Sequence, residues 1–437
     1  MGRGLTLVQP PSSEGAGSPA VSSGLAANYA AMAVVGAAGI VINLLIAASA
    51  DASALGLFSQ TYVTFVVAAQ LATGGLHYAT LRWSAIGDRQ EAESVRRKAL
   101  SLVIPLSIAV AGITVALSGP IARAVDSPEL GDSVRLAAVG LVFHAINKVL
   151  LAHHNGLRQM KVFAVFQACR VVFLAIAVAV ILAMTTDARW LGAALTVGEL
   201  TLTLAILTAH PPQLRRGRAS PITVVTHRQL LSFGLKSFGG GLVQELNARV
   251  DVIALAVLVS DKDVGIYTFA ATLIEGALQL LIVLRNNLNP FLAKALAKND
   301  IAAVEELASK FRPWILFASG GLVASTVFIY KPALRLAGLH DQFGNSWPPL
   351  LILVLGLAVA SPLLPFDQVF LLGGRPGLQT GVIASVICSN LALNFVLIPI
   401  LGIEGAALST AASFVAMAVA IWMFARKSFG VSLIQST

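Results

Sequence analysis

The chain has 437 residues, of which 57% are hydrophobic and only 12% charged, whereas soluble globular domains carry about 25% charged residues. With a mean hydropathy of +0.81, the composition is that of a polytopic membrane protein and excludes a soluble enzyme. The net charge of +9 fits the Lys and Arg excess of cytoplasmic loops, so we expect no nucleic-acid partner. Cys169 and Cys388 lie in apolar runs, so we expect no disulfide, metal site or cofactor.

Residues 1–24 are rich in Gly, Ser and Pro and lack the basic segment and apolar core of a signal peptide. We expect a disordered cytoplasmic tail there. Apolar stretches follow, each near the length of about 20 residues that crosses the hydrocarbon core of a bilayer. The twelve stretches cover residues 25–48, 55–77, 99–120, 134–152, 162–184, 190–209, 230–257, 264–287, 313–330, 347–372, 377–401 and 405–425.

These stretches divide into two groups of six. We expect an N-terminal lobe at 25–209, a cytoplasmic linker at 210–229, a C-terminal lobe at 230–427 and a cytoplasmic tail at 428–437. With the N-terminus inside, 19 Lys and Arg residues fall in inner segments and six in outer loops. Because cytoplasmic loops carry the excess of Lys and Arg, both termini are predicted to be cytoplasmic.

Short motifs recur between the two groups. "GLF" at 56–58 pairs with "GIY" at 265–267, and "GAAL" at 192–195 recurs at 405–408, with offsets of 209 and 213. A looser pair is "NGLRQ" and "LGGRP", which occupy the same place in each half. Since six spans per half make both halves enter from the same side, the repeat is parallel. We predict an all-α integral membrane protein with twelve transmembrane helices in two six-helix lobes around a central cavity.

Several segments carry a family resemblance. "ALGLFSQTYV", "NGLRQMKVFAVFQACRVV", "LNARVDVIALAVLVSDKDVGIYTFA", "NLNPFLAKAL" and "NFVLIPILGIEGAALSTA" resemble the polysaccharide flippase (Wzx-type) branch of the MOP exporter superfamily. Other branches are the MATE multidrug transporters and the lipid II flippases, and the latter usually carry fourteen spans. The resemblance covers nearly the whole chain after the tail.

This resemblance implies a V-shaped, MATE-like transporter of the bacterial inner (cytoplasmic) membrane. The implied substrate is an undecaprenyl-diphosphate-linked oligosaccharide, the repeat unit of a surface polysaccharide or exopolysaccharide. It would move from the inner to the outer leaflet by alternating access. The implied partners, besides this substrate and membrane lipids, are the polysaccharide polymerase and glycosyltransferases of the same pathway.

Charged residues also occur inside the predicted spans. Each costs at least about 2.5–3.5 kcal/mol at bilayer depth on insertion scales, so they should line a wet cavity or pair with one another. The basic ones are Lys148, Arg170, Lys236, Arg249 and Arg285, and the acidic ones are Glu199, Glu245, Asp251, Glu275 and Asp367.

The basic residues are candidate substrate contacts, because guanidinium groups bind phosphate or uronate oxygens in bidentate fashion. We expect Arg249 and Arg170, with Lys236, to contact an anionic substrate. Lys148 and Arg285 are further candidates, although both lie near cytoplasmic ends where they can snorkel.

The cavity carboxylates Asp251, Glu245, Asp367 and Glu275 are candidates to bind H⁺ or Na⁺ and couple transport to an ion gradient. Within the seventh span, Glu245 and Arg249 are spaced i, i+4 and predict an ion pair on one helical face. Asp251 is turned by about 160° from Arg249 and lies on another face. His144 in the fourth span is interpreted as a packing residue.

Two other functions fit a polytopic protein. A MATE-type cation-coupled exporter of small molecules would have a cavity dominated by carboxylates and aromatic residues, whereas here basic residues are as numerous and only 7% of residues are aromatic. A membrane glycosyltransferase or ligase would need catalytic acids in a sizeable outer loop. Because the predicted outer loops are short, we expect a transporter and no catalytic residues.

Overall fold

The computed structural model describes residues 19–209, 225–247 and 249–433. They form α-helices joined by short turns and 3₁₀ segments, and no β-strand occurs among them. The helices of the first half are α1 (Pro19–Ser49), α2 (Ala52–Thr73), α3 (Leu76–Ile86), α4 (Arg89–Ala124), α5 (Pro128–Ala138), α6 (Gly140–Gly156), α7 (Met160–Met184) and α8 (Leu191–Ala209). Those of the second half are α9 (His227–Asn247), α10 (Val250–Leu258), α11 (Asp261–Ala297), α12 (Ile301–Phe328), α13 (Tyr330–Leu336), α14 (His340–Phe343), α15 (Trp347–Ala360), α16 (Val369–Leu372), α17 (Pro376–Leu401) and α18 (Ile403–Phe429).

Helix boundaries differ from the predicted domain limits at two places. The first helix begins at Pro19, six residues before the predicted start, because proline suits the first turn of a helix and the small residues after it do not interrupt one. Residues 1–18 of the predicted tail and 210–224 of the predicted linker lie outside the described part of the chain. The last helix ends at Phe429, where Gly430 adopts a left-handed conformation and caps it.

Nine helical segments in the described residues are long and apolar enough to cross a membrane, and the bent pair α5 and α6 adds a tenth. The protein is therefore a helical, multi-pass membrane protein. The two other predicted spans correspond to α1, of which Ala33–Ser49 is the apolar part, and to α9 with α10, which a break divides. The count of twelve stays a prediction for this reason.

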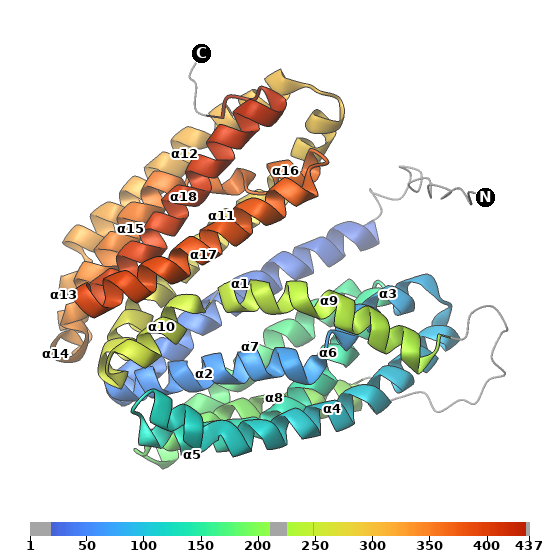
Figure 1. Ribbon diagram of the computed structural model, residues 1–437, viewed down its shortest axis with the longest axis vertical. Coiled ribbons are helices and arrows are strands. Elements are labelled where there is room, and N and C mark those ends of the chain that lie inside the picture. Colours follow the sequence, from blue (N-terminus) through green and yellow to red (C-terminus); the bar gives the residue numbers. More distant parts are fainter. Residues whose placement is uncertain (1–18, 210–224, 248, 434–437) are drawn as a thin grey trace.

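The helices form two bundles that meet at one end of the molecule and diverge toward the other (Figure 1). One bundle contains α2 to α8, and the other contains α11, α12, α15, α17 and α18. A buried apolar cluster with residues from both halves, including Leu55, Val264 and Leu350, joins them. The helix α1 begins, and α18 ends, at the diverging end (Figure 1).

The break within the seventh predicted span divides its contacts between the two bundles. The helix α9 packs on α2, α3 and α4 of the first half, whereas α10 packs mainly on α17 of the second. A close approach of Gly75 to Gly234 brings α9 onto α3, since a Cβ on Gly75 would collide with the Gly234 carbonyl. By contact, α9 therefore lies with the first bundle and α10 with the second, while the predicted lobe limit at residue 230 stays a prediction.

The helices α2 and α11 cross at Gly56 and Gly265, which the repeat pairs with each other. A Cβ on Gly56 would collide with the carbonyl of Asp261, and a Cβ on Gly265 with the carbonyl of Ala52. Ala52 and Asp261 are themselves separated by the offset of 209. Each half therefore presents the same surface to the other, as two-fold related contacts do. This reciprocity supports the predicted duplication.

Candidate functional site

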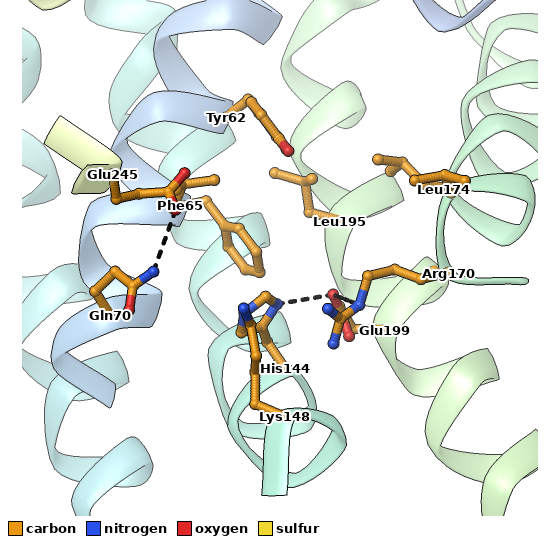
Figure 2. A pocket seen from close by; sticks show the side chains of 13 residues that line it. Tyr62, Phe65, Gln70, His144, Lys148, Arg170, Leu174, Leu195, Glu199 and Glu245 are labelled. Carbon is orange, nitrogen blue, oxygen red and sulfur yellow. Dashed lines mark hydrogen bonds and ion pairs between the residues drawn. The ribbon is translucent and has the colours of Figure 1, made fainter. Parts of the chain in front are cut away.

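A cavity of about 170 Å³ lies within the first bundle, between α2, α6, α7, α8 and the end of α9. Figure 2 shows His144, Lys148, Arg170 and Glu199 gathered on one side of it, with Gln70 and Glu245 on the other. The lining residues are Tyr62, Phe65, Val66, Gln70, His144, Lys148, Arg170, Val171, Leu174, Leu195, Gly198, Glu199 and Glu245. Its walls thus combine apolar and aromatic surface with charges of both signs.

Glu199 is the centre of the polar side. Its carboxylate accepts hydrogen bonds from Nδ1 of His144 at 2.8 Å and from Nδ2 of Asn147 at 2.7 Å, and Nε of Arg170 lies 3.1 Å away. His144 and Asn147 share one face of α6 because they are three residues apart, and Thr203 fixes the Asn147 amide from α8 at 2.9 Å. The Glu199 residue is only 7% exposed, so three helices hold its charge in a fixed position.

Two cationic side chains face this cavity. Lys148 lies one turn after His144 on α6, and Arg170 comes from α7. Nε and Nη2 of Arg170 are buried and have no hydrogen-bond partner among the described residues. Across the cavity, Glu245 accepts a hydrogen bond from Gln70 at 3.3 Å. The guanidinium group of Arg170 therefore keeps two unpaired donors, which a rotation of the side chain would present to a ligand in the cavity.

A second cavity, of about 240 Å³, lies between the two halves. Arg249 occupies the break that separates α9 from α10 and lines this cavity. Its guanidinium group stands 5.1 Å from the ring centre of Tyr62 on α2 and 3.5 Å from Glu275 on α11. Arg249 thus contacts both halves of the chain.

The predicted ion pair of Glu245 with Arg249 is not what the structure shows. Since α9 ends at Asn247 and the chain turns before Val250, the four-residue spacing no longer places the two side chains on one face. Arg249 pairs with Glu275, and Glu245 bonds to Gln70.

Asp251, in the first turn of α10, is held in place from α11. The hydroxyl group of Tyr267 donates to it at 2.6 Å, and Tyr267 is fully buried. Asp251 also lines the second cavity beside Arg249. This hydrogen bond ties the first turn of α10 to α11, close to the break.

Replacing Tyr267 with Phe is therefore expected to destabilise the protein. The free energy of unfolding should fall by about 1.5–3 kcal/mol, the usual contribution of a hydrogen bond to a charged group. Thermal unfolding of the purified protein in detergent measures it. The matched control is Tyr330→Phe, which removes a neutral hydrogen bond to Ser346 of 2.6 Å and should cost about 0.5–1.5 kcal/mol. Equal losses in the two variants would contradict a charged acceptor at Asp251.

The chain resembles known proteins in both sequence and fold. A family model described as "Polysaccharide biosynthesis protein" matches residues 84–348, more than half of the chain. The chain belongs to this family. No curated protein matches the sequence.

Solved structures of several transporters share the fold of this polysaccharide biosynthesis protein. An inward-facing MATE multidrug transporter of the MOP superfamily has a TM-score of 0.74 at 14% identity, with 92% of this chain and 94% of that one covered. The lipid II flippase MurJ, in an inward closed conformation, has a TM-score of 0.73 at 12% identity and coverages of 93% and 87%. A MOP transporter from Pyrococcus furiosus, whose binding pocket is described as having reverse polarity, has a TM-score of 0.62 at 13% identity, with 94% of this chain and 96% of that one covered. The family model thus connects the chain with polysaccharide biosynthesis, and the solved structures show that it has the fold of these transporters.

The remaining predicted site residues of this polysaccharide biosynthesis protein lie elsewhere. Arg285 on α11 forms an ion pair of 2.7 Å with Asp367 in the broken segment between α15 and α16. Both residues lie outside the lining of the two cavities. Lys236, which is exposed on α9, also lies outside it. The structure thus brings Arg170 and Lys148 together in the first cavity, and Arg249, Asp251 and Glu275 in the second.

From the sequence, Glu199 was expected only to line a cavity or to pair with another charge, and His144 to be a packing residue; the structure joins the two by a hydrogen bond in the first cavity. Their hydrogen bond joins residues 55 positions apart. The available signal was an acid in the middle of an apolar span. Its partners could not be found from spacing because they lie on two other helices.

Proposed function

We propose that the chain moves an undecaprenyl-diphosphate-linked oligosaccharide from the inner to the outer leaflet of a bacterial cytoplasmic membrane by alternating access. One observation carries this proposal. The first cavity, within a bundle of apolar helices, contains Lys148 and a buried Arg170 that has unused donors. Such a pair suits a diphosphate, which needs bidentate and point-charge donors to replace its hydration.

The other lining residues suit the rest of this substrate. Tyr62 and Gln70 offer hydrogen-bonding groups of the kind that sugars use, and Phe65, Leu174 and Leu195 supply apolar surface. A cavity of about 170 Å³ is too small for a whole oligosaccharide, so the sugar chain would extend toward the diverging end of the bundles. The lipid tail would stay in the bilayer, because transferring its hydrocarbon to water is costly.

Alternating access needs one end of the molecule closed while the other is open. The end where the bundles meet has the crossing of α2 with α11, and there Asp261 accepts hydrogen bonds from Gln60 at 2.7 Å and Ser127 at 2.6 Å. We place this end on the outer side, which makes both chain ends cytoplasmic and the present state open inward. Glycosyltransferases of the pathway would load the substrate at the inner side, and a polymerase would consume it at the outer side.

Reconstitution tests this function. Purified protein in liposomes should carry a fluorescent undecaprenyl-diphosphate oligosaccharide between leaflets, as measured by a membrane-impermeant quencher. An inward H⁺ or Na⁺ gradient should change the rate, with Asp251, Glu245, Glu275 and Asp367 as the candidate coupling carboxylates. Transport of organic cations without the lipid-linked sugar would favour a MATE-type exporter. A new covalent sugar product would favour a ligase.

Replacing Arg249 with Ala is expected to slow this transport about tenfold, which corresponds to about 1.4 kcal/mol. The physical reason is that Glu275 would lose its guanidinium partner beside the break between α9 and α10. Surface polysaccharide in cells, compared at equal protein level, measures the effect. The control is Arg189→Gln, which removes an exposed guanidinium paired with Asp187. A normal amount of surface polysaccharide in cells with the Arg249→Ala protein would show that transport does not depend on this residue.

A further inference from the structure

Arg170 and Glu199 make an ion pair that can open without disturbing its surroundings. Nε of Arg170 is 3.1 Å from the carboxylate, but it is not aligned for a hydrogen bond, since this nitrogen and Nη2 have no such partner among the described residues. Glu199, by contrast, is fixed by His144 and Asn147. If Arg170 turned to a ligand, the carboxylate would stay where it is.

The same guanidinium group faces the cavity in which we place the diphosphate. A phosphate offers Arg170 two parallel hydrogen bonds, which is a stronger arrangement than the single close approach to Glu199. Glu199 and the phosphate are therefore competing anions for one cation. Lys148 adds a second positive charge on the same side, which offsets part of the negative charge of the loaded site.

A carrier that moves its substrate in one direction must also return without that substrate. Without a counter-ion, Arg170 would keep an uncompensated charge in a protein interior, where such charges are costly. That cost would hold the transporter in whichever state hydrates the cavity. A fixed carboxylate beside Arg170 avoids this cost. The guanidinium group is then paired with the substrate's anionic group in the loaded site and with the carboxylate in the empty site.

We propose that Glu199 is an internal counter-ion that takes the place of the substrate's anionic group on Arg170 and so permits the unloaded transporter to return. Glu199 is a positioning residue and does not itself bind the substrate. The assignment rests on the proposed function. Glu245 does not fill this role, because it lies across the cavity on α9 and bonds to Gln70.

Comparing two modes of transport tests the proposal. Net flipping requires the empty return, whereas exchange of labelled for unlabelled undecaprenyl-diphosphate oligosaccharide across the same liposome membrane does not. In Glu199→Gln protein, net flipping should fall about tenfold, a change of about 1.4 kcal/mol. Exchange should be retained, and binding should tighten, because the competing anion is gone. Glu199→Asn is the second variant, to be used if the Gln variant does not reach the membrane.

Two further proteins complete the experiment. The double variant Arg170→Gln, Glu199→Gln lacks both charges of this pair, so its ratio of net flipping to exchange should return toward the wild-type value while its affinity falls. Asp187→Asn is the matched control, since it removes a carboxylate from an exposed arginine pair outside the cavities and should leave the ratio unchanged.

The possible results separate this proposal from the proposed function. Equal losses of net flipping and exchange in Glu199→Gln would overturn the counter-ion role and indicate a structural one. Undiminished net flipping would overturn it as well. Wild-type protein that neither exchanges nor flips the lipid-linked oligosaccharide would instead refute the transport function on which the inference rests.

Discussion

Replacing Gly56 with Val is expected to abolish transport while the protein still inserts into the membrane. The added side chain would meet the Asp261 carbonyl and the backbone near Gly265. Overpacking usually costs about 1–3 kcal/mol when the neighbouring side chains can adjust. Here the colliding atoms are backbone atoms, which cannot rotate out of the way, so the cost should be larger. The helices α2 and α11 would be forced apart, and the end where the bundles meet would no longer close. Flipping in liposomes measures the loss.

The reciprocal contact sharpens this expectation. Gly265→Val should cause the same defect, since its own Cβ would meet the Ala52 carbonyl. Combining the two substitutions should add little once the helices are separated, because contacting residues are not independent. Gly112→Val on α4 is the control, as no atom lies within 4 Å of a Cβ there. Wild-type flipping in the Gly56 variant would show that this crossing does not close the molecule.

Replacing Arg170 with Gln is expected to lower both the affinity for a diphosphate-linked lipid and the flipping rate. A charge-assisted hydrogen bond contributes about 1.5–3 kcal/mol, which corresponds to roughly a tenfold to hundredfold loss. The variant also leaves the buried Glu199 carboxylate without its guanidinium neighbour, so repulsion of a phosphate adds to the loss. Binding of undecaprenyl diphosphate to protein in detergent, together with flipping in liposomes, measures both effects.

A conservative change at the same position separates charge from geometry. Arg170→Lys keeps the positive charge but loses the planar pair of donors, so it should recover only part of the affinity. Arg189→Gln removes an exposed guanidinium and should bind as the wild type does. Unchanged binding in Arg170→Gln would move the anion contact away from the first cavity.

The general architecture could be predicted from the sequence because it depends on local patterns. Apolar stretches of sufficient length indicated the membrane helices, and the recurrence of Gly56 at Gly265 indicated the duplication. The contact between these two glycines could not be predicted in the same way. It follows from how the halves dock, which a short motif does not encode.

The sequence could provide the candidate site residues but not their partners, for a similar reason. The pairing of Glu245 with Arg249 assumed an unbroken helix, and no Pro or Gly occurs at residues 247–250 to indicate the break. Arg170 and Lys148 were found as intramembrane cations, but their common cavity with Glu199 depends on the packing of α6, α7 and α8. Helical spacing predicts which residues of one helix share a face, but it does not predict their contacts with residues of another helix.

The break between α9 and α10 gives one predicted span contacts with both bundles. The helix α9 covers α3 of the first half, while α10 packs mainly on α17 of the second. The two halves are therefore interlocked at this point, and neither bundle is built only from its own half of the sequence. A substitution on α9 that faces α3 alters the packing of the first bundle, although the residue belongs to the second half of the chain.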